Sequence, residues 1–233
     1  MIYHQKPKYS LDHLDLFETY KFGPIQKDEA LFLFSLVKMT RPTTIVEFGL
    51  LEGHSCLNFV CSKDEKTSYY GFDKDEIAVA RAQKFCEGRS NCFLSQVDCV
   101  DFDSGKIDGR TIDLCFLDCS HILEVNQKCL EKVIPCMSEN AILAIHDTGY
   151  YYKKNLNMLP KSFVDRKPDF LKRFESKDKV SSVKPEQHTV NWFKERWPDW
   201  QQLHIHSENI MRHGITILQK YQKLIIDGGQ NDR

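Results

Sequence analysis

The amino-acid sequence predicts an α/β fold: a doubly wound, mostly parallel sheet that ends in an antiparallel C-terminal hairpin. Short apolar runs alternate with segments of helical periodicity over residues 26–147, as in parallel strands joined by crossover helices. The runs at 113–118 and 141–147 are continuously apolar up to their ends, as expected for strands covered on both faces. A short polar connection between the runs at 200–206 and 214–220 indicates two antiparallel strands.

The predicted elements are clearly separated along the chain. An amphipathic helix is expected at 26–39, with acids in its first turn, and Arg41-Pro42 ends it. Residues 99–112 are rich in Gly and Asp, which predicts mostly loop. Strands are expected at 44–48, 68–73, 91–97, 113–118, 141–147, 200–206 and 214–220. Further helices are expected around 57–60 and at 76–87, 122–137 and 188–197.

Length and composition suit one domain over residues 1–233. The chain carries 32 Lys and Arg against 33 Asp and Glu, so no global field attracts it to nucleic acid or anionic membranes. No apolar run has the length of a membrane span, and the N-terminus lacks a signal-peptide core. The nine cysteines include no C-x-x-C pair and are interpreted as buried, reduced thiols. These features predict a cytoplasmic protein without a membrane partner.

Two segments stand outside the regular alternation. Residues 1–40 are predicted to be an N-terminal helical segment, whose irregular start is a candidate homodimer contact. Residues 151–187 hold ten Lys and Arg against five Asp and Glu and form a basic, lid-like insertion. This insertion could close over an acidic or phosphorylated acceptor, bind an RNA backbone, or be a solvated loop. Tyr150, Tyr151 and Tyr152 at its root are candidates for lining an acceptor pocket.

The stretch 43–60 carries the most informative motif. A β-branched apolar run leads to Glu47, and Gly49, Gly53 and Ser55 complete the pattern E-x-G-x-x-x-G-x-S before a helix. A glycine-rich turn between a strand and a helix lets a ligand approach backbone N–H groups. The absence of Gly-Lys-Ser/Thr excludes a P-loop, and the spacing differs from the G-x-G-x-x-G dinucleotide motif. A turn with purely structural glycines is the alternative interpretation.

Acidic residues follow the predicted parallel strands. Asp73, Asp98, Asp118 and the pair His146-Asp147 all stand at strand ends. In an open parallel sheet, ligands bind outside the carboxyl ends of the strands, so these side chains are expected to converge. Asp73 could accept both hydroxyls of a ribose, a role that serves NAD and S-adenosylmethionine (SAM) equally. Asp98 could instead cap the following turn.

The glycine motif resembles the first motif of class I SAM-dependent methyltransferases. The block 116–148, FLDCSHILEVNQKCLEKVIPCMSENAILAIHDT, resembles the fourth- to fifth-strand region of small-molecule and sugar O-methyltransferases. The resemblance extends from about residue 23 to 220 and leaves the insertion unplaced. It implies a seven-stranded Rossmann-like methyltransferase fold. It also implies methyl transfer from SAM to an oxygen of a sugar, phenol or natural-product hydroxyl.

The resemblance also implies roles for the motif residues. It assigns Asp73 to the ribose of SAM and Asp98 to the adenine, with Asp118 facing the reacting centre. The residues that it places at the methionine portion are Glu47, Gly49, Gly53 and Ser55.

Two catalytic arrangements remain open at this point. Related enzymes hold a divalent ion with the fourth-strand Asp and an acid pair, and here Asp118, His146 and Asp147 stand in those places. His146 departs from the pattern, because an acid is usual there. Two carboxylates and an imidazole could hold Mg²⁺ or another divalent ion. Alternatively, His146 or His121 acts as a metal-free general base.

Other functions compete with this interpretation. RNA or protein could be the methyl acceptor, although no N/D-P-P-[YFW] motif typical of many N-methyltransferases occurs. A NAD-dependent oxidoreductase is disfavoured by the missing G-x-G-x-x-G. A non-catalytic scaffold with the same fold is disfavoured by the full set of strand-end acids. The expected partner is therefore a small-molecule acceptor, and nucleic acid is less favoured.

Overall fold

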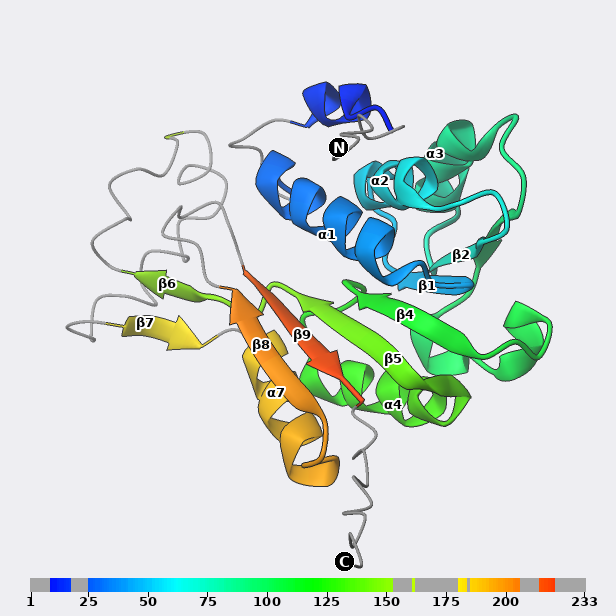
Figure 1. Cartoon of the computed structure of the whole chain (residues 1–233). Helices are drawn as coiled ribbons and strands as arrows, with labels where there is room; N and C mark the ends of the chain where they lie inside the picture. The colour runs from blue at the N-terminus through cyan, green and yellow to red at the C-terminus, as the bar shows by residue number, and fades with distance from the viewer. Residues whose placement is uncertain are drawn as a thin grey trace, which may run out of the picture.

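A seven-stranded sheet forms the centre of the molecule (Figure 1). The computed structural model describes residues 9–17, 25–152, 161, 180–183, 185–205 and 214–220. Within them the strand order is β3-β2-β1-β4-β5-β9-β8. The strands of this sheet are β1 Thr44–Phe48, β2 Ser68–Asp73, β3 Cys92–Gln96, β4 Ile112–Leu117, β5 Met137–His146, β8 Gln201–Ile205 and β9 Ile215–Gln219.

Strands β1 to β5 run parallel, and β9 is antiparallel to both β5 and β8. The predicted doubly wound sheet with a C-terminal antiparallel hairpin is therefore confirmed. Strand order reverses at β1, which pairs with β2 on one side and with β4 on the other. This reversal places a ligand crevice at the carboxyl ends of β1 and β4. Two further strands, β6 Tyr150–Tyr152 and β7 Val180–Val183, pair in a separate sheet.

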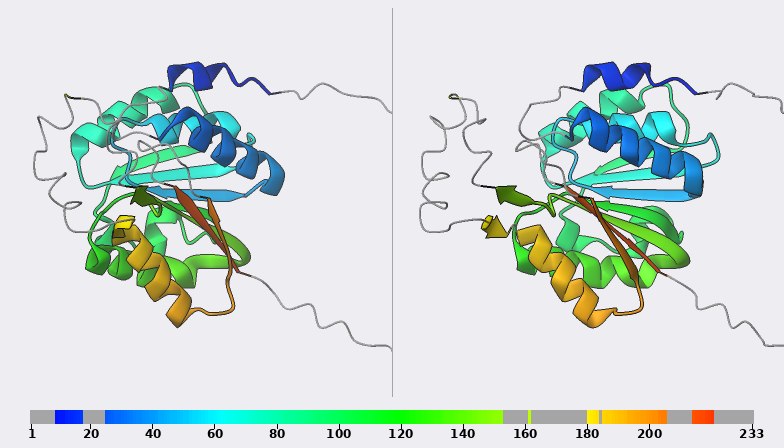
Figure 2. Two further views of the ribbon diagram at one scale, coloured as in Figure 1. Left: turned by 90° about the vertical axis from the view of Figure 1, so that its left-hand side faces the viewer. Right: turned by 60° about the vertical axis from the view of Figure 1, so that its left-hand side comes forward.

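Helices cover both faces of the sheet (Figure 2). One face carries α1 Lys27–Thr40, α2 His54–Ser62 and α3 Glu76–Cys86. The other carries α4 Leu123–Val133 and α7 Pro185–Arg196. Alternate residues of β1 serve the two sides: Ile45 packs into the core beneath α1 and α2, whereas Val46 packs into the core beneath α4 and α7. Both are fully buried, as expected for a central parallel strand.

A carboxylate ties together the starts of three strands. Asp113 on β4 accepts hydrogen bonds from the Thr43 and Thr44 backbone N–H groups and from the Thr43 hydroxyl. It also accepts from the Ser138 hydroxyl on β5. These contacts outweigh the effect of partial burial and hold the pKa of Asp113 below its ordinary value. Asp113 thus stabilises the sheet at the edge opposite the ligand crevice.

Several predicted boundaries were wrong. The helix expected at 122–137 ends at Val133, because Pro135 in the following 3₁₀ turn lacks a backbone donor. Strand β5 consequently begins at Met137, four residues before the predicted start. The helix expected at 188–197 begins at Pro185, since proline suits the first helical turn. The loop expected at 99–112 contains 3₁₀ turns at Cys99–Asp101 and Ser104–Ile107.

Part of the sequence-based interpretation falls on residues that the structure does not describe. Most of the basic insertion predicted at 151–187 lies outside the described residues, which resume at β7 and α7. The nine cysteines are free thiols, but only five of them are buried as predicted; the half-buried ones are Cys61, Cys92, Cys119 and Cys136. None of the helices in the described ranges has both the length and the apolar character needed to cross a membrane.

Candidate active site at the carboxyl edge of the sheet

The glycine loop between β1 and α2 is held by its neighbours on both sides. Gly49, Leu51 and Gly53 all have positive φ, at 96°, 46° and 80°. Asp73 at the end of β2 accepts the backbone N–H groups of Leu50 at 2.7 Å and Leu51 at 3.3 Å. A Cβ at Gly49 would lie 2.2 Å from the Asp118 carbonyl oxygen, so only glycine fits there. The loop is therefore pinned against the ends of β2 and β4.

A cavity of about 240 Å³ opens beside this loop. Gly49, Asp73 and Asp98, three of the predicted cofactor residues, line it. Asp98 also caps the following 3₁₀ turn through the Val100 N–H, so the capping role considered for it is real. The wall opposite the loop comes from residues 119–128, which include Cys119, Ser120, Ile122 and Val125. The cavity thus lies outside the carboxyl ends of the strands, where the sequence places the ligand.

Glu47 and Ser55 lie beneath the loop and do not line this cavity. Glu47 is fully buried on the α2 side of the sheet, where it accepts a hydrogen bond from the Tyr69 hydroxyl. Burial raises the pKa of Glu47 to about 8, although hydrogen bonds from Ser55 and Tyr69 act in the opposite direction. Gly53 is the N-cap residue of α2, and a Cβ there would lie 2.9 Å from the Phe85 ring. These three residues support the loop from within the core.

A charged cluster lies next to the cavity. His146, at the end of β5, is 2% exposed, and its Nδ1 lies 3.2 Å from Asp118 Oδ2 and 3.7 Å from Asp147 Oδ1. Its Nε2 lies 3.3 Å from Glu29 Oε2, on α1. Within the described part of the chain, neither ring nitrogen makes a hydrogen bond of good geometry, so these are ion-pair contacts. Asp118 immediately precedes Cys119, which joins the cluster to the cavity wall.

One proton is firmly held in this cluster. Burial acts to lower the pKa of the His146 imidazole, but Asp118, Glu29 and Asp147 raise it well above its ordinary value. Burial raises the pKa of Asp118, and the effect of His146, which lowers it, is smaller. We place the proton on His146, because three carboxylates surround its ring. A buried imidazolium that balances buried carboxylates satisfies the requirement that buried charges be paired.

A second histidine stands at the outer side of the cluster. His121 Nδ1 contacts the Glu186 carboxylate on α7 and lies 3.8 Å from Asp147 Oδ2. The hydrogen bond to Glu186 raises the pKa of His121, more than burial lowers it. The His121 side chain is 68% exposed, whereas that of Glu186 is 5% exposed. The accessible imidazole is thus oriented by a buried carboxylate.

The structure brings together all four of the predicted catalytic and metal-ligating residues with two that sequence reasoning missed. Asp118, His146 and Asp147 each offer one ligand atom, and these atoms lie within 4.8 Å of one another. The missed residues are Glu29 and Glu186. Glu29 has an ordinary role as the N3 residue of the α1 capping box, which conceals its contact with His146. Glu186 lies inside the segment interpreted as a basic insertion, and no local motif marks it.

Comparison with known proteins gives a consistent result. A family profile described as "Methyltransferase domain" matches residues 46–148. No curated protein matches the sequence. Among solved structures, a putative caffeoyl-CoA O-methyltransferase from Staphylococcus aureus is similar at TM-score 0.61 and 12% identity, over 86% of each chain.

A putative O-methyltransferase from Klebsiella pneumoniae has TM-score 0.61 and 14% identity, over 91% of this chain and 88% of its own. An O-methyltransferase from Bacillus cereus, solved with SAH, has TM-score 0.58 and 13% identity, over 92% of this chain and 94% of its own. At such identities these likenesses concern the fold.

Proposed function

We propose that this chain is a class I SAM-dependent methyltransferase that transfers the methyl group of SAM to an oxygen of a small-molecule acceptor, in keeping with the methyltransferase-domain profile that matches residues 46–148. The observation that carries the proposal is the position of the charged cluster. The cavity beside the glycine loop and the cluster Asp118–His146–Asp147 meet along the short segment 118–121. A cofactor in the cavity and an acceptor at the cluster would therefore be neighbours. Structural neighbours named as O-methyltransferases support oxygen as the acceptor atom.

The cavity suits the nucleoside portion of SAM. Asp73 uses one oxygen for the loop N–H groups, and Asp73 Oδ1 accepts the Asp75 N–H at 3.0 Å. Each carboxylate oxygen has two acceptor sites, so Asp73 Oδ1 retains one site for a ribose hydroxyl. Asp98 at the cavity wall is our candidate for the adenine amino group. Gly49 and Gly53 shape the loop for the methionine portion, and we assign Glu47 and Ser55 to support of that loop from below.

Methyl transfer to a hydroxyl requires a base and alignment, because the sulfonium is already a good leaving group. We assign the base to His121, whose exposed ring is held through Nδ1 by Glu186. This leaves Nε2 as the atom that takes the acceptor proton, and Glu186 stabilises the imidazolium that forms. His146 suits this role less well, because its ring is buried and already protonated between carboxylates. Its proposed role is to balance the charge of the cluster.

A divalent ion is the second arrangement that these residues fit. Asp118, Asp147 and neutral His146 would hold it, and a bound ion would lower the pKa of an acceptor hydroxyl. His146 must first lose the proton that its neighbours stabilise, so acidic pH disfavours ion binding. A divalent ion and the His146 proton would therefore compete for the same three side chains.

The proposed function is tested by binding and by turnover. Calorimetry with SAM and NAD should give binding of SAM only. Radiolabelled SAM should then transfer its methyl to members of a panel of phenols, sugars and hydroxylated natural products. An RNA pool and a protein extract belong in the same panel, and methylation of either in place of every small molecule would reject the proposed acceptor class. His121→Ala provides the catalytic control, because it should keep SAM binding and lose turnover.

A further inference from the structure

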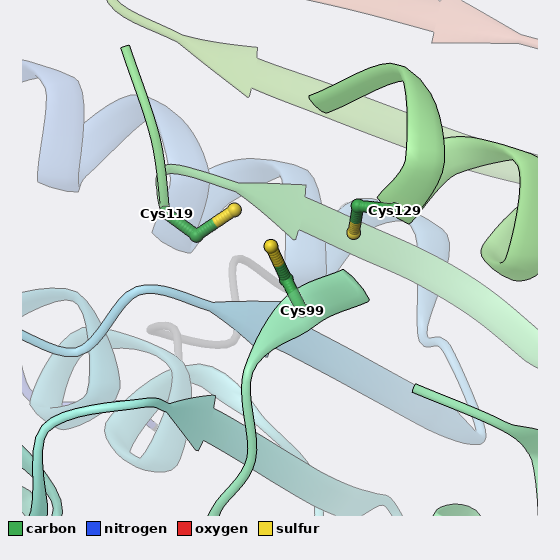
Figure 3. Close-up of side chains that lie close together, drawn as sticks. All are labelled: Cys99, Cys119 and Cys129. Atoms are coloured by element: carbon green, nitrogen blue, oxygen red, sulfur yellow. The ribbon is translucent and has the colours of Figure 1, made fainter. Parts of the chain in front are cut away.

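Three cysteines that are distant in sequence meet at the wall of the cofactor cavity (Figure 3). Cys99 begins the 3₁₀ turn after β3, Cys119 follows β4, and Cys129 lies on α4. Their sulfur atoms lie within 4.8 Å of one another. In Figure 3 the three side chains extend from separate elements toward a common centre. Sequence analysis missed this cluster, because the spacing contains no C-x-x-C pair.

The geometry of the sulfur atoms suits one bound ion. With metal–sulfur bonds of about 2.3 Å, three thiolates around one ion have sulfur–sulfur separations of roughly 3.8–4.0 Å. The observed upper limit of 4.8 Å requires only small movements of side chains. By contrast, Cys56 and Cys86 form a pair at 3.7 Å and are not part of any three-ligand group among the described residues.

The cluster also has an entry path. Cys129 is fully buried and Cys99 is 6% exposed, but Cys99 and Cys119 both line the cavity. An ion can therefore reach the sulfur atoms from the cavity, and a fourth coordination position would face it. Three sulfur donors without an imidazole or a carboxylate select soft ions over Mg²⁺ or Ca²⁺.

We propose that Cys99, Cys119 and Cys129 form a three-thiolate binding site for a soft d¹⁰ cation, Zn²⁺ or Cu⁺. Each sulfur binds as a thiolate: the S–H protons still present pass to solvent and three metal–sulfur bonds form, with no change of oxidation state. The ion would join the turn after β3, the segment after β4 and α4, which are separate in the sequence. It would therefore stabilise the wall of the cavity.

The test uses the full-length, reduced protein freed of metal. Titration with Zn²⁺ and, separately, with Cu⁺ against a chromophoric chelator should give one tight site, with proton release and a rise in Tm. Co²⁺ serves as a spectroscopic substitute, and a thiolate-to-metal charge-transfer band would report sulfur ligation. This band separates the site from the carboxylate–histidine cluster, which would bind Co²⁺ without it. The ion that binds with the higher affinity, Zn²⁺ or Cu⁺, is the preferred occupant of the site.

Single variants Cys99→Ser, Cys119→Ser and Cys129→Ser should each weaken binding by more than the roughly 10- to 100-fold typical of losing an outer-shell partner. Cys136→Ser, on a half-buried cysteine outside the cluster, should bind normally. Because Cys129 lies in the core, the Cys129→Ser variant could fail to fold. Alkylation of the cysteines in the wild-type protein, with and without metal, tests the site without that variant. Bound metal should protect Cys99 and Cys119 and leave Cys136 reactive.

Wild-type affinity for the ion in the Cys99→Ser and Cys119→Ser variants, or a Cys99–Cys119 disulfide in place of metal uptake, would overturn the proposal. None of these readouts uses SAM, so they do not depend on the proposed function.

Discussion

The Asp118 carbonyl oxygen lies where a Cβ of residue 49 would have to be, at 2.2 Å from its ideal position. Gly49 therefore lets β1 and β4 end in contact, and its φ of 96° adds a second reason for glycine. From the sequence alone, a larger residue at 49 is expected to remove SAM binding while leaving the fold. The structure places the backbone of Asp118 and Cys119 in that space.

Gly49→Ala should therefore lose both stability and SAM binding. Left-handed backbone costs about 1–2 kcal/mol and overpacking about 1–3 kcal/mol, so a loss of roughly 2–5 kcal/mol is expected. Gly88→Ala is the matched control, because Gly88 has φ 72° but no heavy atom within 4 Å of its Cβ position. Chemical denaturation of both variants measures the difference. Equal destabilisation of the two variants would show that the Asp118 backbone moves away from a Cβ at residue 49 at little cost in free energy.

Asp73 is expected to act both on the ligand and on the loop. Asp73→Ala should lower SAM affinity by roughly ten- to a hundred-fold, the loss of hydrogen bonds worth about 1.5–3 kcal/mol. Asp73→Asn can still accept the Leu50 N–H, so it should retain more stability than the alanine variant. Asp75→Ala controls for position, since Asp75 only caps α3. Calorimetry on folded variants measures the affinity for SAM. Unchanged affinity in Asp73→Ala would show that Asp73 does not contact SAM.

Glu47 makes the stability of the fold depend on pH between about 4.5 and 8. Burial raises the pKa of Glu47 from 4.5 to about 8, so the native state holds a proton that the unfolded state has lost between these values. Stability should accordingly fall as pH rises through that window, by at most about 1.4 kcal/mol per pH unit. Glu47→Gln keeps an acceptor for Tyr69 and should flatten this dependence. Denaturation curves at several pH values measure it, and the exposed Glu52→Gln variant should keep the wild-type slope.

The pH–rate profile tests the pairing of His121 with Glu186. The base must be neutral to act, so turnover should rise as pH increases through the pKa of His121. Because the Glu186 contact raises this pKa, the acidic limb should lie above that of an ordinary histidine. Glu186→Gln should move the limb to lower pH, and His121→Ala should reduce turnover by roughly 10²–10⁴-fold. Glu131→Gln, on the exposed face of α4, should leave the profile unchanged.

The sequence predicts the central strands well, because their burial on both faces produces runs that end in acids. It also predicts the convergence of Asp118 with His146 and Asp147, since parallel strands end at one edge. Boundaries near proline are less predictable: Pro135 ends α4, whereas Pro185 begins α7. Local pattern alone does not distinguish these uses.

Contacts between distant segments escape prediction for a different reason. Glu186 reaches His121 only because α7 packs beside α4. The three-cysteine cluster likewise needs the turn after β3, the end of β4 and α4 to meet in space. In each case the chemistry belongs to the packing of elements, which no spacing in the sequence records.

Metal removal separates the two catalytic arrangements. If His121 is the base, as we propose, EDTA should leave turnover unchanged, because the buried imidazolium of His146 already balances Asp118 and Asp147. If an ion occupies this cluster, EDTA should abolish turnover, and Mg²⁺ or Mn²⁺ should restore it. Restoration of turnover by Mg²⁺ would identify the carboxylate–histidine cluster as the ion site, because thiolates bind Mg²⁺ poorly and the cysteine cluster would not take it up. Repeating the assay in the Cys99→Ser background removes the remaining ambiguity. Turnover that survives both EDTA and His121→Ala would exclude both arrangements and direct attention to Asp118 itself as the base.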